Sequence, residues 1–251
     1  MSRPWRWLWR GELPADAIRV RYRKDLPELD AELSAAVAEN WRERLARPRA
    51  PHLVDDPVAP LLDFEIRGDG LILHLGRSRY SHWIFTEGRQ GEIEDRFGAG
   101  AACRPLALCA ALITPQGRLI VQRRSDRVAE GAGLLHVPGG HLDPDRHRTE
   151  GSPDPRLAML CELKEELGLE GDELREGRLL GLIENLENGK PELLYRWRTP
   201  LDEEEIHERA AAAEDRFEAD ELLFLAADED WAESRSIPVA VPSRALLELL
   251  R

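Results

Sequence analysis

One segment, residues 154–168, constrains this chain more than any other. It begins with Asp-Pro, which caps a helix and fills its first turn, and it ends with glycine, which commonly terminates one. At 100° per residue the spacing predicts that Glu162, Glu165 and Glu166 gather on one face. The opposite face carries the apolar side chains of Leu157, Met159, Leu160, Leu163 and Leu167. Such a helix needs an apolar layer to pack against, and it presents concentrated negative charge on its other side.

Three carboxylates at this spacing repel one another, by roughly 0.2–0.5 kcal/mol per pair. An ordinary solvated acidic face is one interpretation, and a site for a divalent cation with oxygen ligands is the other. The surroundings favour the second. Gly139 and Gly140 lie upstream, where missing side chains let the backbone approach a phosphate or a metal. Arg123 and Arg124 end a predicted strand and could hold a diphosphate.

Composition excludes several classes of protein. The 251 residues include 35 basic and 48 acidic side chains, and the net charge of −13 disfavours binding to nucleic acid. Cys103, Cys109 and Cys161 form no CxxC pair and predict reduced thiols in a cytoplasmic protein. No apolar run reaches the ~18 residues of a membrane span, and the first residues lack the apolar core of a signal peptide.

The chain is predicted to divide near residue 100 into a small N-terminal α+β module, residues 1–100, and a second domain, residues 101–251. The module starts with a strand on which Trp5, Trp7 and Trp9 share one face. Residues 77–87 show no clean period and predict a loop, and the acidic residues 203–218 predict a solvated helix. The other predicted elements are a helix at 28–47, a closing helix at 242–251, and strands at 17–23, 61–67, 71–75, 106–114, 118–124, 179–185, 193–197 and 221–225.

The second half of this arrangement resembles the signature of the Nudix hydrolases. That signature runs Gly, five residues, Glu, seven residues, Arg-Glu, an apolar residue, any residue, Glu-Glu, any residue, Gly. The matching positions here are Gly140, Glu162, Leu163, Glu165, Glu166 and Gly168. Three features depart from it. Cys161 replaces the arginine, Arg146 stands where the first glutamate should fall, and Gly140 lies 22 positions before Glu162 instead of 15, so seven residues are inserted.

A longer stretch resembles the UDP-glucose pyrophosphatase branch of that family, which also has a stretched signature without the usual arginine. The similarity runs through residues 125–144 and extends to Trp41–Leu45, Tyr80 and Asn185, and so covers most of the chain. Glu87 departs from it, because this branch is expected to have asparagine there.

The resemblance implies an α/β fold, a Nudix-type α/β/α sandwich with a mixed sheet, preceded by the N-terminal module. It also implies Mg²⁺-dependent hydrolysis of UDP-glucose or UDP-galactose to UMP and a sugar 1-phosphate, with Mn²⁺ as an alternative metal. Glu162 and Glu166 would be the main metal ligands and Glu165 a third, and all three would be catalytic. The expected substrate-binding residues are Tyr80, Arg123, Arg124, Gly139, Gly140, His141 and Asn185.

Other interpretations stay open at this level. The substrate could be another nucleoside diphosphate such as ADP-ribose. Because Cys161 and Arg146 depart from the signature, a Nudix-like nucleotide-binding or regulatory domain without turnover is a further alternative, although three clustered carboxylates argue against it. Tyr80 could simply pack between the two modules, His141 could be solvated, and Cys161 is expected to be a packed thiol. The sequence leaves monomer and homodimer equally open.

Overall fold

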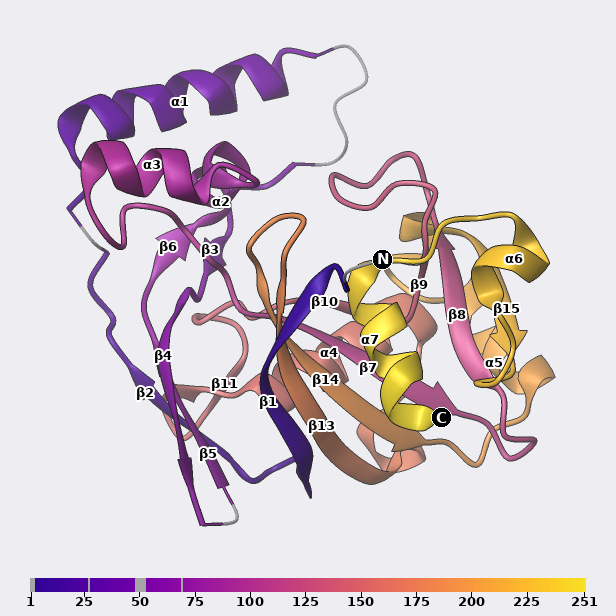
Figure 1. Ribbon diagram of the computed structural model, residues 1–251. Helices are drawn as coiled ribbons and strands as arrows, with labels where there is room; N and C mark the ends of the chain where they lie inside the picture. Colours follow the sequence, from indigo (N-terminus) through magenta and orange to yellow (C-terminus); the bar gives the residue numbers. More distant parts are fainter. Residues whose placement is uncertain (1–2, 27, 48–52, 69) are drawn as a thin grey trace.

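The computed structural model describes residues 3–26, 28–47, 53–68 and 70–251, and its main feature is a mixed β-sheet (Figure 1). β14 and β7 pair in parallel, whereas the other neighbours along the sheet are antiparallel. Two short strands, β9 (Leu135–His136) and β10 (Gly139–His141), extend it. In spatial order the main strands are β1 (Trp5–Pro14), β13 (Arg175–Asn185), β14 (Pro191–Arg198), β7 (Ala107–Ile113), β8 (Leu119–Arg124) and β15 (Ala219–Leu225).

Helices cover both faces of this sheet, and the alternation of side chains along β7 shows why. Leu108 and Leu112 join the apolar cluster that contains residues of α4 (Pro155–Leu167) and α5 (Glu203–Ala211). Ala111 is adjacent to Leu112 in the strand, so its side chain points to the opposite face, and it joins the cluster that contains residues of α7 (Val241–Leu250). A strand buried on both faces reads as a continuous apolar run, as β7 does. The predicted α/β/α sandwich is therefore confirmed, with α7 in front of the sheet in Figure 1 and α4 behind it.

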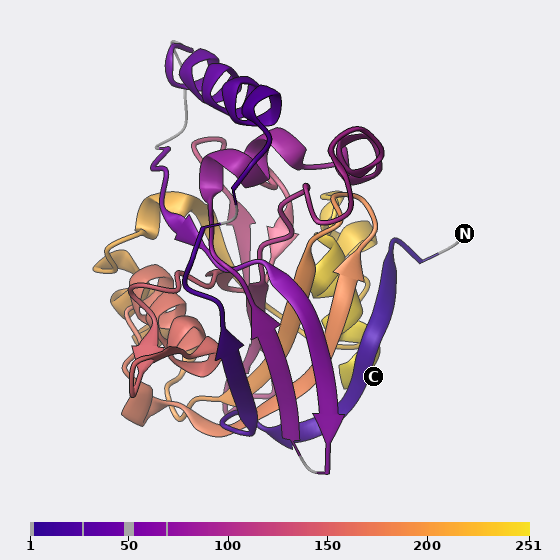
Figure 2. The same cartoon turned by 90° about the vertical axis from the view of Figure 1, so that its left-hand side faces the viewer.

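The N-terminal part forms a second, smaller layer beside the sandwich (Figure 2). Its sheet has the order β2-β5-β4, and helices lie at one end of it. Its first strand, β1, is instead hydrogen-bonded to β13 as an edge strand of the main sheet. The elements after β1 are β2 (Ile18–Tyr22), α1 (Ala31–Leu45), β3 (Pro57–Val58), β4 (Leu61–Arg67), β5 (Gly70–Leu75), β6 (Ser78–Arg79), α2 (Tyr80–Thr86) and α3 (Gln90–Phe97).

Two predicted segments differ from the structure. Residues 77–87, expected to be a loop, form β6 and α2, because burial of Trp83 and Ile84 between neighbouring elements decides their conformation where periodicity could not. The expected helix at 203–218 ends at Ala211, and a 3₁₀ turn at Arg216–Glu218 follows it. A short helix, α6 (Trp231–Arg235), follows β15. None of the described helices is both long and apolar enough to cross a membrane.

The helix α4 begins and ends where the sequence predicts. The Asp154 side chain accepts hydrogen bonds from the backbone N–H groups of Arg156 (2.9 Å) and Leu157 (3.1 Å). Gly168 ends the helix with a left-handed backbone, φ 69°. Glu166 is only 3% exposed, so this part of the acidic face is not solvated. Its carboxylate is buried against β10, where it accepts a hydrogen bond from the Gly139 N–H.

Candidate active site

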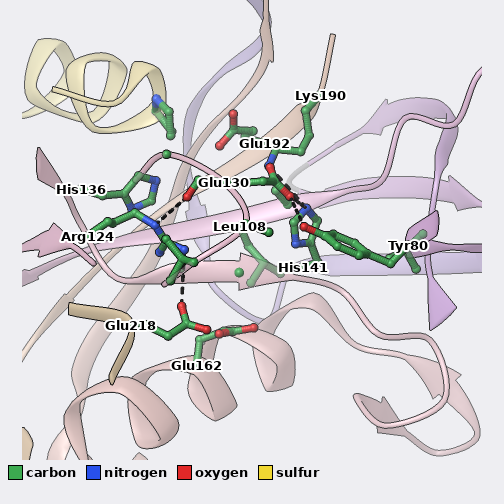
Figure 3. Close-up of a pocket in the computed structure, with 18 of the residues that line it drawn as sticks. Tyr80, Leu108, Arg124, Glu130, His136, His141, Glu162, Lys190, Glu192 and Glu218 are labelled. Carbon is green, nitrogen blue, oxygen red and sulfur yellow. Dashed lines mark hydrogen bonds and ion pairs between the residues drawn. The ribbon is translucent and has the colours of Figure 1, made fainter. Parts of the chain in front are cut away.

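A cavity of about 700 Å³ lies where α4, the glycine strand β10, the loop after β8 and the N-terminal part meet (Figure 3). Its walls come from segments far apart in the chain. Carboxylates gather at the end next to α4, and a denser polar network fills the end next to α2 and the turn between β13 and β14. The predicted site residues on its wall are Tyr80, Arg124, Gly139, Gly140, His141, Glu162, Glu165 and Asn185.

The two glycines allow the carboxylates of α4 to lie directly against the backbone of β10. A Cβ atom at Gly140 would overlap the Glu162 carboxylate, and one at Gly139 would overlap the backbone of Leu108 and Cys109. The Gly139 N–H donates to Glu166 Oε2 at 3.3 Å. Any larger residue at Gly140 would therefore displace the Glu162 carboxylate. The predicted approach of a phosphate or a metal to these glycines stays a prediction.

The carboxylates of Glu162 and Glu166, at the acidic end of the cavity, are buried, and burial disfavours their charged forms. Burial, followed by the charge of Glu218, raises the pKa of Glu162 to about 8. Burial and then Glu162 raise the pKa of Glu166, whose Oε1 has no hydrogen-bond partner among the described residues. The described residues contain no group of three His, Cys, Asp or Glu side chains already arranged to hold a metal. An unpartnered carboxylate oxygen beside a second buried carboxylate is nevertheless a donor set that suits a hard divalent cation.

Glu165 has a partner of a different kind. It forms an ion pair with Arg146, the residue that stands where the signature expects its first glutamate. Glu165 is 13% exposed in its side chain, whereas Arg146 is 58% exposed. The third predicted ligand is therefore held by an arginine from the inserted loop between β10 and α4.

Arg124 and Arg123 occupy opposite faces of β8, and only the first reaches the cavity. Arg124 donates to Glu218 (3.4 Å) and to the Glu130 carbonyl (3.1 Å), and it is mostly buried. Arg123 lies outside the cavity, with Asp220 and Glu221 as its nearest acidic neighbours. Because side chains alternate along a strand, consecutive arginines cannot both face one ligand here. The expectation that Arg123 contacts substrate is therefore corrected.

At the other end of the cavity, Glu130 is the centre of a hydrogen-bond network. Its carboxylate accepts from Lys190 Nζ (2.6 Å), the Tyr80 hydroxyl (2.9 Å) and Trp83 Nε1 (3.1 Å). Although burial disfavours its charge, Lys190 and His141 hold the pKa of Glu130 well below its ordinary value. Figure 3 shows Lys190 and Tyr80 converging on the Glu130 carboxylate. The network ties the loop after β8 to α2 and to the turn between β13 and β14.

Three of the predicted residues, Tyr80, His141 and Asn185, lie in this network or beside it. Burial and then Lys190 lower the pKa of His141 to about 4, so its ring is neutral at pH 7. Tyr80 meets the His141 ring edge-on, with centroids 5.8 Å apart, and it also contacts Trp41. Asn185 donates to Glu192 at 3.0 Å. Tyr80 therefore both packs between the N-terminal part and the sandwich and faces the cavity.

Sequence reasoning missed several residues of this site. Glu218 fell within the acidic stretch interpreted as a solvated helix, and no local signal separates it from its neighbours. Glu130 lies in the segment that resembles the UDP-glucose pyrophosphatase branch, but its role depends on the distant Lys190. Cys161 is half-buried, and burial raises the pKa of its thiol, which agrees with a packed residue and not a nucleophile.

Comparison with known proteins places this geometry in a family. The model of the NUDIX domain matches residues 104–238, and the chain belongs to that family. Uridine diphosphate glucose pyrophosphatase NUDT22 of Homo sapiens is 30% identical over 70% of this chain and 66% of its own length. Nudix hydrolase 9 of Arabidopsis thaliana is 27% identical over 50% of this chain and 46% of its own length. This chain thus spans less than two thirds of these relatives. The predicted membership of the Nudix hydrolases is confirmed.

Proposed function

We propose that this protein hydrolyses the diphosphate of a nucleoside diphosphate-sugar, with UDP-glucose or UDP-galactose as the preferred substrate and UMP and a sugar 1-phosphate as products. Mg²⁺ is the proposed cofactor, and Mn²⁺ is the alternative. The proposal assigns the diphosphate to the α4 end of the cavity and the rest of the substrate to the end around Glu130. The names of the human, mouse and cattle relatives support this choice of substrate.

The observation that carries the proposal is the arrangement of Glu162 and Glu166 against β10. Burial raises the pKa of both carboxylates, Glu162 raises that of Glu166 further, and one oxygen of Glu166 has no partner among the described residues, so the pair is unfavourable in its charged form without a cation. Glu162 and Glu166 would hold the metal, with Glu165 and Glu218 beside them. When bound, the metal would supply charge neutralisation of the phosphate oxygens and an activated water.

The other groups of the acidic end bind and orient the substrate. Arg124 faces the α4 carboxylates from β8, and its planar guanidinium suits a phosphate oxygen pair. Gly139 and Gly140 let the α4 carboxylates lie against the backbone of β10, because neither glycine carries a side chain, and so they place these carboxylates at the proposed phosphate-binding end. Burial of these residues also keeps bulk water away from the diphosphate, which strengthens each electrostatic contact.

The end around Glu130 would position the base or the sugar. Tyr80 offers an aromatic face, and Asn185 and Lys190 offer hydrogen-bond donors. The neutral ring of His141 contributes a donor or an acceptor without adding charge. These groups are already held by neighbours, so the substrate meets a preorganised surface.

The test is product analysis of purified protein incubated with UDP-glucose and Mg²⁺, beside a sample containing EDTA. We expect UMP and glucose 1-phosphate in the first sample only. UDP-galactose, ADP-ribose and other nucleoside diphosphates complete the panel. A strong preference for an adenine substrate would retain the reaction class and overturn the proposed substrate. Absence of turnover across the panel would favour a nucleotide-binding domain.

A further inference from the structure

The loop between β10 and α4 carries the seven inserted residues, and it is fixed at several points near Arg146. The Asp143 side chain accepts from the backbone N–H groups of Asp145 (2.7 Å) and Arg146 (3.2 Å). The His147 N–H donates to the Asp143 carbonyl (3.0 Å), and Arg77 of the N-terminal part forms a two-point ion pair with Asp145. The backbone at Arg146 is therefore held, while its long side chain stays free to change partners.

The cations of the cavity differ in how strongly they are held. The side chains of Arg124 and Lys190 are 13% and 10% exposed, and each is bonded to groups of its own wall. Arg127 is tied to the backbone carbonyl of Phe217 at 3.1 Å. Arg146 is 58% exposed, and its described partner is Glu165. Moving Arg146 therefore requires less change in solvation than moving Arg124 or Lys190. Arg127 is exposed as well, but its partner is a backbone carbonyl and not a carboxylate of the proposed metal site.

The partner of Arg146 is itself a carboxylate of the proposed metal site. An ion pair whose arginine is exposed to solvent is weak, so a ligand can replace it. A diphosphate offers an arginine two parallel charge-assisted hydrogen bonds and more negative charge than a single carboxylate. Exchange of Glu165 for phosphate is thus favourable, and it leaves Glu165 with a free carboxylate.

We propose that Arg146 exchanges partners during substrate binding, from Glu165 in the free protein to the substrate's diphosphate, and so releases Glu165 toward the metal. This inference rests on the proposed function and deepens it. It makes the inserted loop a working part of the site. It also makes Arg146 a substrate-binding residue at the position where the signature has a glutamate, and it couples phosphate binding to the availability of the third carboxylate.

The exchange predicts two opposite effects of the substitution Arg146→Met, which removes the charge and keeps a straight side chain. Without substrate, Glu165 loses its counter-charge, so Mn²⁺ titrated into the protein and followed by electron paramagnetic resonance should bind at least about threefold tighter. With substrate, the lost phosphate contacts should raise KM for UDP-glucose by about 10- to 100-fold, with a smaller change in kcat.

Arg148→Met is the matched control, because Arg148 belongs to the same loop and donates to the Gly151 carbonyl, away from the cavity. It should leave both measurements within about twofold. In the double variant with Glu165→Gln, Arg146→Met should no longer tighten Mn²⁺ binding, since the group that it masks is gone. Unchanged Mn²⁺ affinity in Arg146→Met, or an unchanged KM, would overturn the exchange. Weaker binding of both Mn²⁺ and UDP-glucose by Arg146→Met, together with a lower Tm, would assign Arg146 a structural role and would also overturn the exchange.

Inorganic pyrophosphate separates this inference from the proposed function. Its binding is measured by calorimetry with Mn²⁺ present, and it needs no turnover. We expect Arg146→Met to weaken pyrophosphate binding at least tenfold. This expectation holds even if the native protein cleaves none of the nucleotides in the panel. Equal pyrophosphate affinity of the native protein and Arg146→Met would contradict the exchange, whatever the substrate panel shows.

Discussion

The two ends of the cavity are both buried and both rich in carboxylates, but they are built differently. At the Glu130 end, the Glu130 carboxylate faces the Lys190 ammonium group and accepts three hydrogen bonds. At the α4 end, Glu162 and Glu166 face each other and Glu218, and one carboxylate oxygen has no partner among the described residues. Their pKa values accordingly move in opposite directions, down for Glu130 and up for the α4 pair.

The difference separates a network that holds elements of the fold together from a pair of carboxylates that suits the proposed metal. A satisfied network rigidifies the elements that it joins, here the loop after β8, α2 and the turn between β13 and β14. An unsatisfied buried charge lowers stability until something binds it. Substitutions at the two ends should therefore have opposite consequences for activity and for folding, and three predictions follow from that contrast.

The largest expected effect comes from Glu166→Gln, which keeps the shape of the side chain and removes its charge. We expect kcat for UDP-glucose to fall by about 10³-fold, because the proposed metal loses a ligand. The Tm in EDTA should not fall, since an unpartnered buried charge has been removed. Activity assays and thermal unfolding measure the two quantities. The control is Glu170→Gln, at an exposed glutamate paired with Lys164 just beyond α4. Equal activity of the two variants would exclude Glu166 from the reaction.

The next effect is on stability, at the opposite end. Lys190→Met leaves the Glu130 carboxylate buried without its cation, and we expect a loss of about 3–5 kcal/mol in the free energy of unfolding. Lys164→Met removes the exposed partner of Glu170 and should cost no more than ~1 kcal/mol. Urea unfolding compares the two variants. If their stabilities match, the network around Glu130 does not hold the fold.

The third prediction is a dependence of stability on pH. The folded protein keeps a proton on Glu162 up to a pKa of about 8, whereas the unfolded chain releases it near 4.5. The folded state therefore binds more protons between these values, and stability should fall as pH rises through this window. Without metal we expect Tm to drop between pH 5 and pH 8 by about 2–4 °C for each kcal/mol lost. Excess Mg²⁺ should reverse the drop at pH 8, and Glu166→Gln should show a weaker reversal. A Tm that is independent of both pH and Mg²⁺ would contradict the raised pKa of Glu162 and the proposed binding of a cation at the acidic end.

Local patterns in the sequence were sufficient for the elements that carry the chemistry. The caps at Asp154 and Gly168 fixed the length of α4, and the apolar runs placed the central strands. The predicted division near residue 100 stays a prediction. The strand β1, from the first part of the chain, pairs with β13 of the main sheet and so crosses that boundary. The loop predicted at 77–87 failed because its helix depends on burial of Trp83, a contact between elements.

The sequence by itself determined which residues could meet a cation and a phosphate, because residue type, helical spacing and the absence of a side chain are local properties. Only the tertiary structure decided which of them do. It turned Arg124 into the cavity and Arg123 away from it, buried Glu166, and brought Glu218 and Lys190 to the site from distant positions in the chain. It also paired Arg146 with Glu165. Burial and partner choice depend on which surfaces face each other after folding, and no sequence period encodes them.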